Sequence, residues 1–143
     1  AMDVIEHIEN DQQAFDWMYG QLKPGGVMIL TVPAFQWMFS HHDVALNHCR
    51  RYTLTQLHAL NHQKMHRLFA SYFNFTLFPL AVLTRLKSKS SGKKGRGEKQ
   101  NSDVPGLIDG LFLFLLRAEA RMIRAGIRFP WGLTAVVVYR KQQ

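Results

Sequence analysis

The first quarter of the chain has the hydrophobic pattern of a helix followed by a buried strand. The apolar positions of residues 11–22 fall on one helical face: Ala14, Phe15, Met18 and Leu22. Asn10 or Asp11 can cap the first turn, and the Lys-Pro-Gly-Gly stretch at 23–26 ends the helix. Residues 27–32 are apolar on both faces, which is typical of a strand inside a parallel sheet. This order of elements predicts an α/β unit.

The middle of the chain begins with a long irregular segment, residues 33–52, which is rich in aromatic, histidine and charged side chains. Segments of this length inside compact domains are usually functional. Thr53 is followed three residues later by Gln, which is the capping-box pattern that opens a helix. Residues 65–73 then predict a strand, and residues 76–86 predict a helix.

The last third of the chain combines an amphipathic helix with a final strand. Apolar residues recur at three- and four-residue spacing over residues 105–125, and several arginines occupy the opposite face. Residues 133–139 are rich in β-branched side chains and predict a strand. The apolar stripe of the helix can pack on the sheet or on a partner chain. An anionic membrane surface is a third alternative, because a basic segment lies beside the helix.

The charge of the chain is strongly positive and unevenly distributed. The formal net charge is +8, and an excess of this kind attracts phosphate groups. Much of it lies in residues 87–104, a segment rich in Ser, Gly and Lys, which we expect to be a flexible basic loop within the domain. Aromatic residues do not alternate with these lysines, and no nucleic-acid motif is present, so we expect no nucleic-acid partner. The single Cys49 excludes an internal disulfide.

Four local sequences resemble the class I S-adenosylmethionine-dependent methyltransferases, and among these a subgroup that acts on small molecules. Residues 3–9 (DVIEHIE) are similar to the segment after the family's fourth strand. Residues 22–26 (LKPGG) resemble the turn into the fifth strand. Residues 32–34 (VPA), with the histidine-rich stretch and residues 50–53 (RRYT) downstream, resemble the small-molecule subgroup. Residues 136–141 (VVVYRK) are similar to the last, antiparallel strand.

This resemblance implies an α/β fold that is the C-terminal portion of a Rossmann-like methyltransferase fold. We expect a mixed sheet with an antiparallel last strand and added helices, in a single incomplete domain over residues 1–143. The family's opening strand, its glycine-rich turn and the acidic residue that binds the ribose are missing, and Gly25 and Gly26 follow a helix instead. The strand at residues 27–32 would then have an open apolar edge, so we expect self-association through it.

The resemblance also assigns candidate residues around the cofactor, S-adenosylmethionine, in the full-length protein. Met2, Asp3 and Val4 would lie against the cofactor, although Asp3 is also explained by a turn at a strand end. His7 is the candidate general base, with Glu6 beside it as the second catalytic candidate, because the pKa of imidazole lies near neutrality. A structural hydrogen bond at the start of a helix is the alternative for His7.

The irregular segment supplies the candidate residues for the methyl acceptor. Aromatic side chains would form apolar walls and an arginine would meet an anionic group: Pro33, Phe35, Trp37, Asp43, His48, Arg51 and Tyr52. A position in the core explains Phe35 and Trp37 equally well. We expect no metal site, because Glu6 and His7 alone are too few ligands. The spacing of the remaining candidates also matches no zinc pattern: His41, His42, Asp43 and His48.

These features favour methyl transfer from S-adenosylmethionine to a small or lipid-like acceptor in the full-length protein, with this chain inactive alone. The alternative is a non-catalytic binding or assembly module, peripheral to a membrane. No apolar run is long enough to span a bilayer, and the first residues lack the pattern of a signal peptide. We therefore expect a cytoplasmic protein, with contact to a membrane surface as the open alternative.

Overall fold

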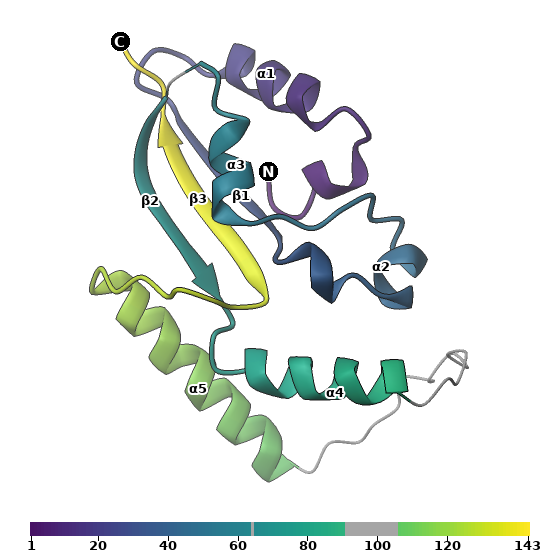
Figure 1. The fold of residues 1–143 in the computed structure, drawn as a ribbon. Coiled ribbons are helices and arrows are strands. Elements are labelled where there is room, and N and C mark those ends of the chain that lie inside the picture. Colours follow the sequence, from purple (N-terminus) through teal and green to yellow (C-terminus); the bar gives the residue numbers. More distant parts are fainter. Residues whose placement is uncertain (64, 91–105) are drawn as a thin grey trace.

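The computed structural model describes residues 1–63, 65–90 and 106–143, and these residues form a three-stranded sheet with helices around it (Figure 1). The strands are ordered β1-β3-β2, with bounds Val27–Pro33, Thr134–Arg140 and His66–Phe73 respectively. The central strand β3 pairs antiparallel with both neighbours. In this register Val137 faces Leu30 of β1 on one side and Ala70 of β2 on the other.

The free side of β1 has a short parallel partner at the start of the chain. Met2 forms a parallel bridge with Thr31, and the Asp3 amide donates to the Thr31 carbonyl at 2.9 Å. The sheet is therefore mixed with an antiparallel last strand, which confirms the predicted fold class. The described chain covers only one face of the start of β1, however, because Val27 and Ile29 are 44% and 50% exposed.

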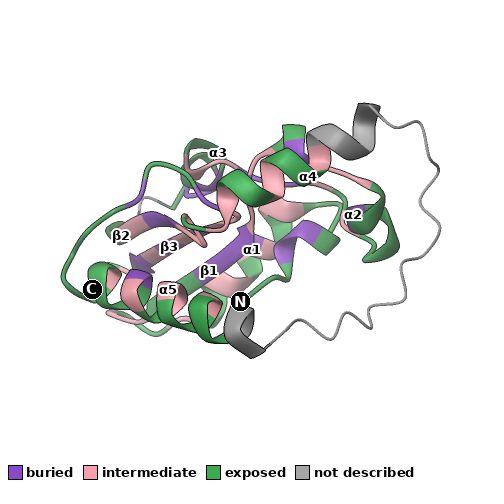
Figure 2. Ribbon diagram, turned by 90° about the horizontal axis from the view of Figure 1, so that it is seen from below, coloured by how far each residue is buried: buried purple, intermediate pink, exposed green. Residues whose placement is uncertain are grey.

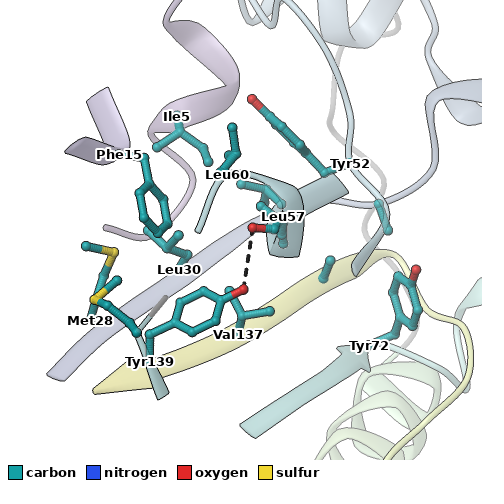
Figure 3. Packing of buried hydrophobic residues seen from close by; sticks show 14 residues of the cluster. Ile5, Phe15, Met28, Leu30, Tyr52, Leu57, Leu60, Tyr72, Val137 and Tyr139 are labelled. Atoms are coloured by element: carbon teal, nitrogen blue, oxygen red, sulfur yellow. Dashed lines mark hydrogen bonds between the residues drawn. The ribbon is translucent and has the colours of Figure 1, made fainter. Parts of the chain in front are cut away.

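The core lies on one face of the sheet, against helices α1 (Asp11–Gln21) and α3 (Leu54–Ala59). Phe15 of α1 and Leu57 of α3 are fully buried, and both point toward strand side chains (Figure 3). The Tyr139 hydroxyl donates to the Leu57 carbonyl at 3.4 Å, which satisfies the polar end of a fully buried ring. Burying one such large apolar side chain stabilises the fold by about 1.5–3 kcal/mol.

Both of these helices begin at the caps that the sequence predicts. The Asn10 side chain accepts a hydrogen bond from the Gln13 amide at 3.0 Å at the start of α1. At the start of α3, Thr53 and Gln56 each accept a bond from the other's backbone amide, which completes the capping box. Substituting such a cap by alanine typically costs about 1 kcal/mol.

Two longer helices, α4 (Phe78–Ser90) and α5 (Gly106–Arg124), lie beyond the end of β2 (Figure 1). Glu119 of α5 is buried and accepts hydrogen bonds from the amides of Phe75 and Thr76, which anchors α5 to the turn before α4. The helix α4 continues to Ser90, beyond its predicted end and into the predicted basic loop. Residues 91–104 of that loop lie outside the described residues.

Apolar side chains are exposed on both of these helices. Exposed and half-buried positions alternate along α4 and α5 (Figure 2). The exposed fractions of Leu83 and Phe114 are 56% and 63%. In the described part of the chain, no helix combines the length and the apolar character that crossing a bilayer requires.

Candidate functional site

The candidate residues gather where residues 1–3 and β1 both end. These segments run parallel, so their carboxyl ends lie at the same edge of the sheet. The first leads into a short 3-10 helix, η1 (Ile5–His7). The second leads into a segment that contains another 3-10 helix, η2 (Gln36–Met38), and the short helix α2 (His41–Ala45). Ligands of α/β folds bind outside this kind of edge.

Backbone strain is concentrated at this edge. Asp3, Phe35 and Asn47 have positive φ angles of 50°, 61° and 57°. Residues other than glycine rarely adopt such angles, and they persist only where the surrounding structure holds them. Residues that the sequence assigns to cofactor and acceptor, Asp3 and Phe35, are therefore held in unusual conformations.

A strap formed by residues 47–52 runs along η1 and the start of α1. The Cys49 amide donates to the Glu6 carbonyl at 2.7 Å. The Arg50 guanidinium donates to the Glu9 carbonyl at 2.6 Å and pairs with Asp11 at 2.8 Å. These bonds join residues about 40 positions apart in the sequence, and they place the strap's side chains against η1.

The strap brings His48 to Glu6 and His7, which forms the Glu6–His7–His48 cluster. One ligand-type atom from each of the three side chains lies within 4.8 Å of the others. The Glu6 Oε1 to His7 Nε2 distance is 3.9 Å. The two imidazole rings meet edge to face, with centroids 4.7 Å apart and an angle of 76° between their planes.

Each imidazole of the cluster uses its Nδ1 atom for a hydrogen bond. His7 Nδ1 lies 3.2 Å from the Asn47 carbonyl, and His48 Nδ1 lies 3.1 Å from Asp43 Oδ1. A carbonyl and an ionised carboxylate only accept hydrogen bonds, so Nδ1 carries the proton in both rings. In the neutral form of each ring, the Nε2 atom therefore keeps a free lone pair.

Glu6 is the unusual member of the cluster, because its side chain is 0% exposed. Neither carboxylate oxygen has a hydrogen-bond partner among the described residues. Burial raises the pKa of Glu6 above its usual value, and the negative charge of Asp3 adds to this, while its own backbone amide and the neighbouring His7 and His48 offset part of the rise. A buried carboxylate without partners is costly. This position therefore favours a bound proton or cation.

The predicted cofactor-binding residues lie at the same edge of the sheet and are open to solvent. Met2 is 70% exposed and Val4 is 42% exposed. Asp3 is also exposed, and its Oδ1 accepts a bond from the Thr31 hydroxyl at 3.4 Å. These residues therefore form an accessible surface at this edge of the sheet. Gly25, with φ of 75°, instead serves the turn at the opposite end of β1, where its amide donates to the Lys141 carbonyl.

Three residues predicted to bind the acceptor already have partners inside the protein. Arg51 is 7% exposed, and its Nε donates to Asp43 Oδ1 at 2.7 Å. Burial alone would raise the pKa of Asp43, but hydrogen bonds from Arg51 and His48 lower it to about 2. The Tyr52 hydroxyl donates to Asp11 at 2.8 Å. Binding of an anion by Arg51 would therefore have to compete with Asp43.

The predicted apolar walls form one aromatic group. Phe35 stacks on Tyr72, with ring centroids 4.8 Å apart, and meets Phe78 edge to face at 5.6 Å. Trp37 extends this group toward solvent and is 53% exposed. Pro33 contributes through its carbonyl, which accepts the Tyr52 amide at 2.9 Å. Phe35 is thus partly core, while Trp37 offers an accessible apolar surface.

Two further residues shape the site and were not found from the sequence. Asn47 orients His7, and its φ of 57° suits asparagine better than most residues. The signal in the sequence that could have identified Asn47 is its position directly before the candidate residue His48. Arg85 of α4 lies 3.6 Å from Asp43, and no local pattern marks that approach.

Comparison with known proteins supports the fold. No protein-family model matches the chain, and no curated protein matches it in sequence. Among solved structures, the chain is similar to a methyltransferase: phosphoethanolamine N-methyltransferase 2 of Haemonchus contortus, in complex with S-adenosyl-L-methionine. The TM-score is 0.50 and the sequence identity is 16%. The alignment covers 99% of this chain and 32% of that one, so the chain spans about a third of that protein's length. The chain therefore shares part of a methyltransferase fold.

Proposed function

We propose that the protein transfers a methyl group from S-adenosylmethionine to a small or lipid-like acceptor. In this proposal the 143 residues form the acceptor side of the site, and a glycine-rich wall for the cofactor comes from residues outside them. One observation carries the proposal. The exposed Met2–Val4 segment and the Glu6–His7–His48 cluster share the edge of the sheet where residues 1–3, bridged in parallel to β1, and β1 itself both end. Such edges are where α/β folds bind their ligands.

Methyl transfer requires the protein mainly to orient the acceptor and to remove its proton. The sulfonium methyl donor is already activated, so holding the acceptor in line supplies much of the rate enhancement. His7 Nε2 has a free lone pair that can take a proton from the acceptor, and Glu6 at 3.9 Å stabilises the imidazolium that results. General-base catalysis of this kind contributes about 10²–10⁴-fold. Trp37 and Phe35 supply the apolar wall for the acceptor.

Calorimetry with S-adenosylmethionine tests the cofactor part of this proposal. We expect no detectable binding to the 143 residues alone, and saturable binding to a longer chain in which a strand and glycine-rich turn precede them. Asp3→Ala in the longer chain should weaken binding about tenfold, the effect of losing about 1.4 kcal/mol. Glu9→Ala, which removes another exposed carboxylate, is the matched control and should bind normally. A folded longer chain that does not bind the cofactor would refute the proposal.

A non-catalytic binding or assembly role is the second candidate. It is favoured by the exposed apolar side chains of α4 and α5, such as Leu83 and Phe114. Co-sedimentation with anionic vesicles at low salt tests a membrane-surface form of this role. Leu83→Ser combined with Phe114→Ser should then release the chain from the vesicles. If the wild-type chain stays in the supernatant, binding to a membrane surface is excluded.

A further inference from the structure

We propose that Glu6, His7 and His48 form a binding site for a divalent transition-metal ion of the Zn²⁺ type. The inference does not depend on methyl transfer, because it concerns side chains of this chain alone and is tested without a methyl donor. It also departs from the sequence-based expectation of no metal. The fold adds a third ligand, from a distant segment, to the Glu6 and His7 pair.

The first argument is the convergence of three side chains that carry ligand-type atoms. The ligand-type atoms of the three side chains lie within 4.8 Å of one another, and Glu6 Oε1 lies 3.9 Å from His7 Nε2. Ligands bound about 2.1 Å from one ion lie roughly 3–4 Å apart. Side-chain movements of about 1 Å would therefore bring the three atoms to the distances that a common ion requires.

The second argument is that Glu6 is buried and that neither of its carboxylate oxygens has a hydrogen-bond partner among the described residues. Its side chain is 0% exposed. Buried charges in proteins are normally paired or coordinate metals. A cation between Glu6 and the two imidazoles would supply the missing partner.

The third argument concerns the orientation of the two imidazoles. Histidines that bind metals usually donate their second ring N–H to a carboxylate or a backbone carbonyl, which fixes the ring and leaves the other nitrogen free for the ion. His48 does this through Asp43 at 3.1 Å, and His7 does it through the Asn47 carbonyl at 3.2 Å. The positive φ of Asn47 and the buried position of Asp43 hold these partners in place.

The donor set selects the class of ion. Two imidazole nitrogens and one carboxylate suit Zn²⁺, Fe²⁺, Co²⁺ or Ni²⁺, whereas Mg²⁺ and Ca²⁺ prefer oxygen ligands throughout. The His7 side chain is 39% exposed, so water or an acceptor hydroxyl can reach the ion. With the ion bound, His7 Nε2 would be a ligand and not the base of the proposed methyl transfer, and the ion would supply the acidity of the oxygen that it holds.

Direct metal titration of the tag-free 143-residue chain tests the site. Calorimetry with Zn²⁺ should show one ion per chain, and Co²⁺ should produce visible absorption bands that saturate at the same ratio. Loss of an orienting partner alone typically costs 10–100-fold in metal affinity. Glu6→Gln and His7→Ala each remove a ligand, and should therefore lower the affinity at least tenfold. Both variants should keep the circular dichroism of the wild type.

Two control variants separate this site from incidental binding. His62→Ala removes an exposed histidine outside the cluster, and Cys49→Ser removes the only thiol; both should bind Zn²⁺ as the wild type does. Absence of saturable Zn²⁺ binding would overturn the proposal. Wild-type affinity for Zn²⁺ in both Glu6→Gln and His7→Ala would also overturn it. Displacement of Co²⁺ by a modest excess of Mg²⁺ would overturn the assigned class of ion.

Discussion

Replacing Glu6 by methionine should make the metal-free chain more stable at neutral pH. Methionine has a similar length and no charge, so the substitution removes a buried carboxylate that has no partner among the described residues. A buried polar group without a partner costs about 1–3 kcal/mol, and more when it is charged. We therefore expect the free energy of unfolding to rise by about 1–3 kcal/mol at pH 7.

The pH dependence separates this charge effect from simple hydrophobic packing. The pKa of Glu6 is raised above its usual 4.5, so the folded chain binds the Glu6 proton more tightly than the unfolded chain does. The stability that this proton confers is fully present below pH 4.5 and is lost as the pH rises through the folded-state pKa. The advantage of Glu6→Met should therefore be largest at pH 7 and shrink toward pH 4.

Urea unfolding in the presence of EDTA measures both quantities, because the denaturant midpoint reports stability when the slope is unchanged. Glu119→Met is the matched control, since Glu119 is equally buried but accepts hydrogen bonds from the amides of Phe75 and Thr76. That variant should be destabilised by about 1–3 kcal/mol, because it leaves the amides of Phe75 and Thr76 without their acceptor. Equal or lower stability of Glu6→Met at pH 7, or a gain that is unchanged at pH 4, would refute the reasoning.

Three further predictions concern the fold, the sheet edge and the proposed base. Asp43→Asn should lower the free energy of unfolding by about 2 kcal/mol at pH 7, because the pKa of Asp43 falls from 3.8 to about 2 on folding. This stability is present above pH 3.8 and lost as the pH falls through 2, so acid unfolding curves of the two chains should converge there. Light scattering should show a dimer or larger assembly that Ile29→Lys converts to monomer, because Ile29 lies on the exposed apolar face of β1 and a charge there opposes association; a monomeric wild type would contradict this. In an active full-length form, His7→Ala should lower turnover about 10²–10⁴-fold without altering thermal stability, and unchanged turnover would exclude His7 from the chemistry.

The elements that the sequence predicted correctly depend on neighbouring residues. The caps at Asn10 and Thr53 follow from a side chain within three positions of the amide that it binds. The buried strand over residues 27–32 follows from its apolar run. The expectation that both faces of this strand are buried was wrong, because Val27 and Ile29 lack a covering element in the described chain. A local sequence pattern cannot reveal whether such a covering element is present.

The make-up of the candidate site was only partly predictable for the same reason. Glu6 and His7 are adjacent, so their association could be read from the sequence. His48 joins them only through the strap, whose bonds span about 40 residues, such as that from Arg50 to the Glu9 carbonyl. The sequence interpretation therefore assigned His48 to the acceptor side and counted one ligand too few for a metal.

Two buried carboxylates at this site show how the structure separates stability from function. Asp43 and Glu6 are both 0% exposed. Asp43 is surrounded by donors from Arg51, His48 and Ser40, and its pKa is lowered, so its charge stabilises the fold. Glu6 lacks such donors and its pKa is raised, so its charge opposes folding. A residue that destabilises the free chain is best explained by a partner that arrives later, and His48, held by Asp43, is positioned to share that partner.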